Sequence, residues 1–116
     1  MNDPHRMNDP HKAIDYMIAN ATAYAQAKAD RILLEEFRKT KKALLMKEAL
    51  SKGYEAVNAQ EREAYSDDEY IQVLHGIRDA VKKEEELKWM LEAARMRVDV
   101  WRTEQATART QVSATL

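Results

Sequence analysis

The sequence has no cysteine and few residues that break helices: its 116 residues include two glycines and two prolines. The missing cysteine excludes disulfides, thiolate metal ligands and a cysteine nucleophile. Few glycines and prolines, together with 34 % charged residues, are typical of long helices rather than sheets. A chain of this length forms one domain with one modest core. We therefore expect an all-α protein.

The chain also lacks a strong net charge and a long apolar run. Its formal charge is −1, so no global field draws it towards nucleic acid or a lipid surface. No apolar run approaches the roughly 20 residues that a membrane span needs, and the N-terminus lacks the apolar centre of a signal peptide. We expect a soluble, cytoplasmic protein with no membrane contact.

The N-terminus contains a short near-repeat, in which residues 1–6 recur as residues 7–12 with one change. A repeat this short cannot be a folded unit, and we expect residues 1–9 to be disordered. Asp9 followed by Pro10 favours a helix start. The Asp side chain can accept hydrogen bonds from first-turn amides, and Pro at the first helical position loses none.

Apolar residues at helical spacing predict a first helix over residues 10–64. Gly53 interrupts it, at a cost of about 1 kcal/mol in a helix interior. We expect the helix to continue through Gly53 with a bend, because nothing else nearby resembles a turn. The face that we expect to be buried comprises Ile14, Met17, Ile18, Ala21, Tyr24, Ala25, Leu33, Phe37, Leu44, Ala49 and Leu50.

A turn near residues 65–66 precedes a second predicted helix over residues 67–109. Ser66 with Glu69 matches a reciprocal capping box, and Asp67 and Asp68 lie where the helix dipole favours negative charge. We expect residues 111–116 to be a frayed tail. One heptad register, interrupted by Glu84 and Gln105, contains Val73, Ile77, Ala80, Leu87, Leu91, Ala94, Val98, Trp101 and Ala108.

Two long helices and a tight turn predict an elongated, coiled-coil-like antiparallel helical hairpin, a single domain over residues 10–110. Its arms would extend roughly 60 to 80 Å. A two-helix hairpin cannot cover the second apolar stripe of residues 67–109, so we expect a dimer or higher oligomer. The predicted oligomer interface comprises Trp89, Met90, Ala93, Met96 and Val100.

Basic residues gather in two segments that such a hairpin would bring together, because residue 38 would lie beside about residue 94. A basic patch of this kind can contact phosphates, although solvated helix faces with neighbouring carboxylates are the simpler explanation. The predicted binding face for DNA or a partner comprises Arg38, Lys39, Lys41, Lys42, Lys47, Arg95, Arg97 and Arg102.

Catalytic and metal-binding patterns are missing from the sequence. Paired carboxylates are common, but none has a histidine at metal-ligand helical spacing, and His75 is solitary. There is no glycine-rich phosphate loop and no nucleophile elbow. We expect a protein that is not an enzyme and that has no cofactor, no metal and no small-molecule substrate.

Three strings resemble small helical proteins of tailed bacteriophages and prophages: Arg31–Ala43, Gln60–Tyr65 and Val100–Glu104. The resemblance spans about residues 7–110. It implies an accessory protein of DNA recombination or replication in the host cytoplasm, binding DNA or a host or phage DNA-processing protein. It assigns no site residues.

Two other functions fit the same residues. An inhibitor of a host nuclease or helicase could use an acidic helical rod whose phosphate mimics are the carboxylates around the turn and Glu84–Glu86. The carboxylates around the turn are Glu61, Glu63, Asp67, Asp68 and Glu69. A purely structural coiled-coil oligomer would use neither set of charges.

Overall fold

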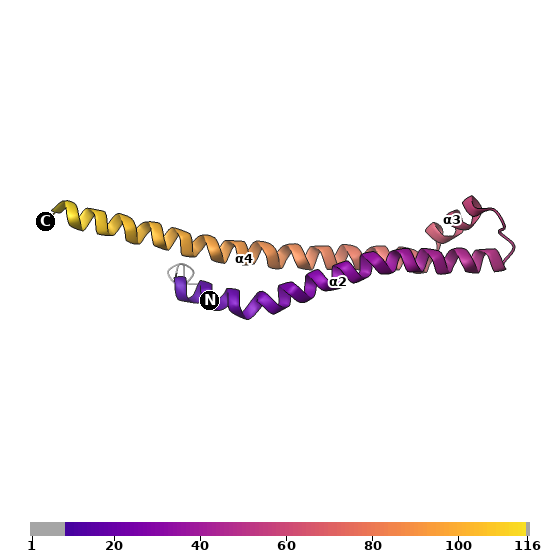
Figure 1. Ribbon diagram of the computed structural model, residues 1–116, viewed down its shortest axis with the longest axis horizontal. Helices are drawn as coiled ribbons and strands as arrows, with labels where there is room; N and C mark the ends of the chain where they lie inside the picture. Colours follow the sequence, from indigo (N-terminus) through magenta and orange to yellow (C-terminus); the bar gives the residue numbers. More distant parts are fainter. Residues whose placement is uncertain (1–8, 116) are drawn as a thin grey trace. The chain divides into compact units, whose positions relative to one another are not determined.

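The computed structural model describes residues 9–115, and within them it contains three α-helices and no strand. The helices are α2 (Pro10–Ser51), α3 (Val57–Ser66) and α4 (Asp68–Thr115), shown in Figure 1. The prediction of an all-α protein is confirmed. The disorder predicted for the N-terminus falls on residues 1–8, which lie outside the described residues, and on Asp9.

Helix α2 begins where the sequence predicts it. The backbone N–H of His11 donates to Asp9 Oδ1 at 2.9 Å, and that of Ala13 donates to the Asp9 carbonyl at 3.1 Å. Asp9 therefore caps the helix, and the first-turn amides that lack a partner within the helix are partly satisfied.

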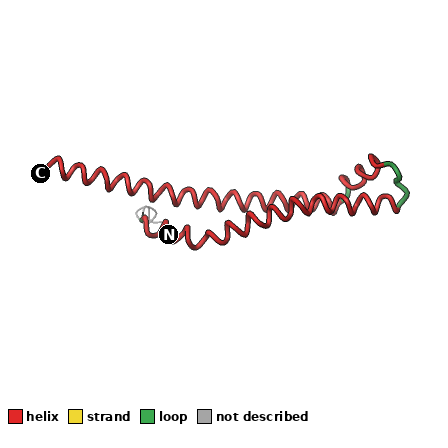
Figure 2. Tube along the Cα trace, viewed as in Figure 1, coloured by secondary structure: helices red, strands yellow, loops and turns green. Residues whose placement is uncertain are grey.

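Helix α2 ends at Ser51, so the predicted continuous helix over residues 10–64 is wrong; Figure 2 shows the loop that follows it. Gly53 has a φ of 104°. The N–H of Gly53 donates to the Leu50 carbonyl and that of Tyr54 to the Ala49 carbonyl, both at 3.1 Å. These two bonds around a left-handed glycine are the Schellman pattern, which terminates helices.

The junction between α3 and α4 is a single extended residue, Asp67, with φ −72° and ψ 137°. Its Oδ1 accepts the backbone N–H of Glu69 at 2.8 Å, so Asp67 is the N-cap of α4. The predicted capping box is wrong, because Ser66 is the last residue of α3. Its hydroxyl donates backwards to the Arg62 carbonyl at 2.8 Å.

Helix α4 continues to Thr115, so the predicted frayed tail is wrong over residues 111–115. No glycine or proline follows Gly76 to stop the helix. Thr110 satisfies its hydroxyl within the helix by donating to the Ala106 carbonyl at 3.0 Å. Every residue over 101–115 is exposed, so local backbone bonding alone holds this end.

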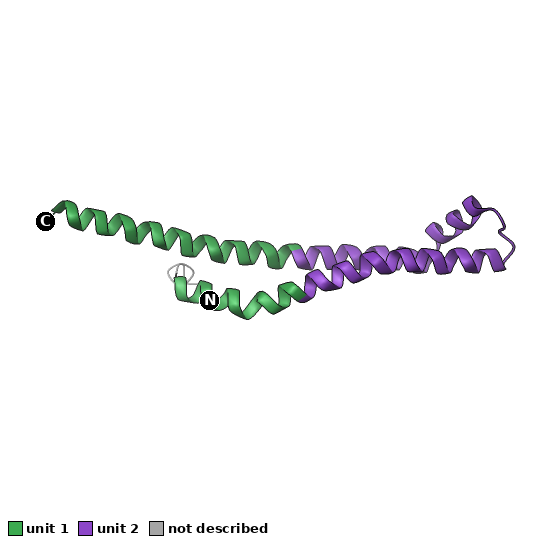
Figure 3. Ribbon diagram, viewed as in Figure 1, with its two compact units in different colours: residues 1–25, 85–116 green, residues 26–84 purple. Residues whose placement is uncertain are grey.

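The chain divides into two compact units, shown in Figure 3: unit 1 is residues 1–25 with 85–116, and unit 2 is residues 26–84. Unit 2 contains the one cluster of buried apolar side chains in the described chain, formed by Leu45 of α2, Ala64 of α3 and Tyr70 of α4, with Met46 packed against it. Within the described part of unit 1, Ala13 and Ala94 are the buried residues.

The covered face of α2 differs from the predicted one. The predicted face contains Ile18 and Leu33, which are 71 % and 68 % exposed, and Phe37, Leu44 and Leu50 are exposed as well. Ala49 is buried as predicted, and the other buried residues of α2 are Ala13, Ala27 and Leu45, none of which was in the predicted face. Small alanines let neighbouring helices approach closely, and the large apolar residues then lie beside the contact rather than in it.

The predicted register of α4 agrees with the burial pattern. Ala94 is buried, and Leu87, Leu91 and Val98 are partly covered. Glu84, which interrupts this register in the sequence, is nevertheless 7 % exposed. Trp101 and Ala108, the last two members of this register, are the exceptions, because both are exposed.

Candidate interaction surfaces

Glu84 is buried in unit 2 because Arg31 satisfies it. The Arg31 guanidinium donates to both carboxylate oxygens of Glu84, from Nε to Oε2 and from Nη2 to Oε1 at 3.2 Å. Nη1 donates to Glu35 Oε2 at 3.0 Å. These hydrogen bonds, with that to Glu84 the strongest, raise the pKa of Arg31 above its already high ordinary value. The pair fixes which residues of α2 and α4 lie opposite each other in unit 2, with Arg31 opposite Glu84.

Two lysines of α2 extend this network towards α3 and α4. Lys41 Nζ lies 2.7 Å from a Glu69 oxygen, and Lys42 Nζ lies 3.6 Å from a Glu61 oxygen. Lys42 Nζ is also 4.7 Å from the centroid of the Tyr65 ring, within cation–π range. Tyr65, more than Glu61, raises the pKa of Lys42.

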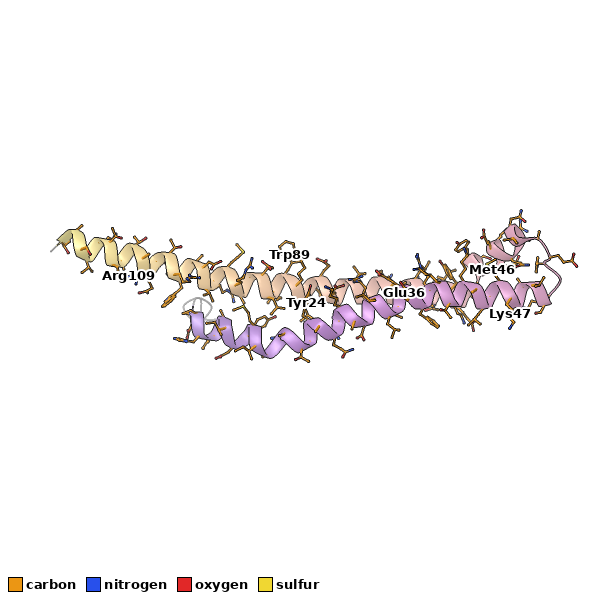
Figure 4. The ribbon with its side chains drawn as sticks, viewed as in Figure 1. Tyr24, Glu36, Met46, Lys47, Trp89 and Arg109 are labelled. Atoms are coloured by element: carbon orange, nitrogen blue, oxygen red, sulfur yellow. The ribbon has the colours of Figure 1, made fainter. Side chains whose placement is uncertain are left out.

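An aromatic pair ties α3 to α4 beside this network. The rings of Tyr65 and Tyr70 meet edge to face, with centroids 5.4 Å apart and an interplanar angle of 75°, a favourable quadrupole geometry. Figure 4 shows Met46 on the α3 side of α2 and Lys47 on the opposite side. The three helices of unit 2 thus meet through apolar, aromatic and ionic contacts at once.

The predicted basic face is largely neutralised by carboxylates of the same chain. Arg38, Lys47 and Arg97 are its members without an ion pair among residues 9–115. The ion pairs of the other five members are Lys39 with Glu36 at 3.2 Å, Lys41 with Glu69, Lys42 with Glu61, Arg95 with Glu92 at 3.2 Å and Arg102 with Asp99 at 3.9 Å.

The predicted juxtaposition of residues 38 and 94 is wrong, because Arg38 meets a part of α4 that belongs to unit 2. Arg38 lines a surface depression with Leu74 and Ile77, whereas residue 94 lies 17 residues beyond Ile77 in the sequence. The physical reason is the break at Gly53. The loop and α3 take residues 52–67 out of the helix pairing, so residue 31 meets residue 84.

Two of the carboxylates predicted for a nucleic-acid mimic have structural roles. Glu84 is buried against Arg31, and Asp67 caps α4. A carboxylate that is buried or that accepts a backbone N–H is less available to a cationic channel. Inhibition of a nuclease or helicase through this set stays a prediction.

Helix α4 presents a second apolar stripe in unit 1, here called the α4 stripe: Trp89, Met90, Ala93, Met96 and Val100. Trp89 is 65 % exposed and Met96 is 62 % exposed. The spacing of Trp89, Ala93, Met96 and Val100 is four, three, four, which is that of a helix-packing seam. Figure 4 shows Trp89 on the side of α4 turned away from residues 10–25. Its assignment as an oligomer interface stays a prediction.

A groove in unit 2, here called the 27–83 groove, was missed by sequence reasoning. Its volume is about 370 Å³, and it is lined by Ala27, Asp30, Leu33, Leu34, Ala80 and Lys83. Nearby, Gly76 lies against Leu34, whose Cδ1 would be 3.9 Å from an added Cβ. The small side chains of Ala27 and Ala80 leave space for the groove. The groove could be predicted from the sequence only if the pairing of α2 with α4 were known.

Within residues 9–115, no three carboxylate or histidine side chains are grouped so that they could hold a metal ion. In the same part of the chain, no helix is both long enough and apolar enough to cross a membrane. No known protein family, curated protein or solved structure matches the chain.

Proposed function

We propose that the chain is a non-enzymatic helical accessory protein that acts by binding another protein through the α4 stripe. The exposure of Trp89 and Met96 on a seam-spaced stripe carries this proposal. Exposed aromatic and methionine side chains are enriched at the centres of protein interfaces.

The scaffold in this proposal is an antiparallel hairpin of α2 and α4. The pairs Arg31–Glu84 and Lys41–Glu69 support it, because residue numbers rise along α2 as they fall along α4. Such a hairpin holds α4 rigidly enough to present one face to a partner.

A protein partner is favoured over direct contact with DNA. Phosphate binding gains its affinity from cations that displace counterions, and five of the eight predicted basic residues already face a carboxylate. The resemblance to phage proteins of replication and recombination regions supports a DNA-processing protein as the partner.

The test has a protein arm and a DNA arm. The immobilised wild type captures a defined DNA-processing protein from host lysate, identified by mass spectrometry and then confirmed with the purified partner. Met96→Glu abolishes that binding. Val112→Glu, a matched change at another exposed apolar position of α4, leaves it intact. Equal binding by wild type and Met96→Glu contradicts the proposal.

In the DNA arm, fluorescence anisotropy at low salt compares the wild type with Arg38→Glu/Lys47→Glu, on single- and double-stranded DNA. We expect weak binding that the substitutions barely change. Tight DNA binding that is abolished by these substitutions would instead support direct contact with DNA as the function.

A further inference from the structure

We propose that two copies of this chain pair about a two-fold axis through the 27–83 groove of unit 2. This inference goes beyond the proposed function, because it leaves the α4 stripe of each copy free for a different partner. The occupant of the groove is the same segment of the second copy, with each Leu33 lying across the groove of the other. Leu33 is exposed at the edge of its own groove.

Opposite charges on the groove lining support a second copy as its occupant. Asp30 and Lys83 both line the groove. Neither has an ion-pair partner among residues 9–115, although Asp30 accepts a hydrogen bond from Gln26 at 2.8 Å. A surface that carries one acid and one base is self-complementary about a two-fold axis, since each charge then meets its opposite on the partner.

The positions of these charges along the helices fit an antiparallel pair of α2 segments with the axis near Leu33. The Arg31–Glu84 pair sets the level of α4 against α2, so Lys83 is level with Ile32. Asp30 of the second copy would then lie about one helical turn, or roughly 6 Å, from that level. The length of a lysine side chain spans this offset.

The apolar residues on α2 continue the same surface. Leu33, Phe37 and Leu44 are exposed and lie at heptad-compatible spacing, with Thr40 between the last two. Within one chain, the described residues bury five alanines, one leucine and one tyrosine as their apolar core. That is little apolar burial against the entropy of ordering a chain this long. A second copy would cover side chains that one copy leaves in water.

A charge swap tests the pairing, with mass measured by sedimentation equilibrium over a range of concentrations. Asp30→Lys and Lys83→Asp each place like charges across the axis and should weaken the dimer by at least about tenfold. The double variant Asp30→Lys/Lys83→Asp should restore wild-type affinity. Asp15→Lys and Lys88→Asp change the net charge equally at exposed positions outside the groove and should leave the mass unchanged.

A cysteine cross-link tests the geometry independently, because the native chain has no cysteine. Under mild oxidation, Leu33→Cys should form a covalent dimer, whereas Leu44→Cys, exposed on the same helix away from the axis, should not. Circular dichroism checks that all variants remain helical. A monomeric wild type, unchanged mass in the single charge variants, or a double variant that fails to recover would each overturn the proposal. So would loss of the dimer in Met96→Glu with the groove variants unaffected.

Discussion

Units 1 and 2 are built from the same two long helices but are held by different kinds of contact. In unit 2, ion pairs within a helix such as Lys39–Glu36 are joined by pairs between residues far apart in the sequence, as in Arg31–Glu84 and Lys41–Glu69. In the described part of unit 1, the ion pairs join residues three apart on one helix, as in Arg95–Glu92. Contacts distant in sequence define a tertiary structure, whereas pairs within a helix stabilise only that helix.

This difference indicates that unit 2 stabilises the fold, whereas in the proposed function unit 1 offers its exposed side chains to a partner protein. Unit 2 has the Leu45–Ala64–Tyr70 cluster and a glycine-terminated turn, so substitutions there should change the free energy of unfolding. Unit 1 leaves Trp89 and Met96 in solvent, so substitutions there should change binding instead.

The largest expected effect comes from a substitution that breaks the Leu45–Ala64–Tyr70 cluster of unit 2. Tyr70→Ala removes a ring that is 6 % exposed and in contact with Tyr65, and should lower the free energy of unfolding by about 3 kcal/mol. Trp89→Ala, an equally large truncation in unit 1, should change it by less than about 0.5 kcal/mol. Urea unfolding followed by circular dichroism measures both. Equal losses would erase the distinction between the units.

The second-largest effect concerns the Arg31–Glu84 ion pair, which fixes the residues of α2 and α4 that lie opposite each other. Arg31→Leu removes the guanidinium that pairs with the buried Glu84 carboxylate and should lower the unfolding midpoint by several degrees. In Arg31→Leu/Glu84→Leu the apolar register of α4 is restored, and the midpoint should recover most of the loss. Thermal unfolding of the two variants gives the comparison. A double variant that recovers none of the loss relative to the wild type would contradict this expectation and would show that the pair contributes more to stability than it costs to bury.

Two glycine substitutions should have opposite signs. Gly53→Ala places a side chain at φ 104° and should destabilise unit 2 by about 1 kcal/mol, although nothing lies within 4 Å of the new Cβ. Gly76→Ala, in a helix interior with room for a Cβ, should stabilise by about 0.5 kcal/mol. Urea midpoints report both. Stabilisation by Gly53→Ala would favour the continuous helix that the sequence predicts.

The last prediction distinguishes Asp67, which caps α4, from the adjacent Ser66, which does not. Asp67→Ala removes the acceptor of the Glu69 N–H and should cost about 1 kcal/mol. Ser66→Ala removes only a hydroxyl that donates to a carbonyl already within α3, so its cost should be near zero. Differential scanning calorimetry resolves the pair. A larger loss from Ser66→Ala would reinstate the capping box.

The helices could be predicted from the sequence because propensity and capping act locally. Asp9 with Pro10 marked one helix start, and the scarcity of glycine and proline indicated the all-α class. The register of α4 was predictable too, since Leu91 and Ala94 lie in a heptad pattern that only Glu84 and Gln105 interrupt.

The error at Gly53 has a physical cause. A lone glycine tolerated within a helix and one that ends it have the same local sequence, and the distant contacts of α3 decide between them. That error shifted the pairing of the helices, and with it the predicted meeting of Arg38 and Arg95. The covered face of α2 was misassigned because size suggested Ile18 and Leu33, whereas close packing selected Ala13 and Ala27.

The contrast between the two units is tested most directly by native-state hydrogen exchange, read peptide by peptide by mass spectrometry. Amides over residues 41–49 and 60–84 should exchange at least about a hundredfold more slowly than those over residues 101–115. The first segments open only when the cluster and ion pairs break, whereas the exposed end of α4 opens locally. Equal protection in the two regions would contradict this account.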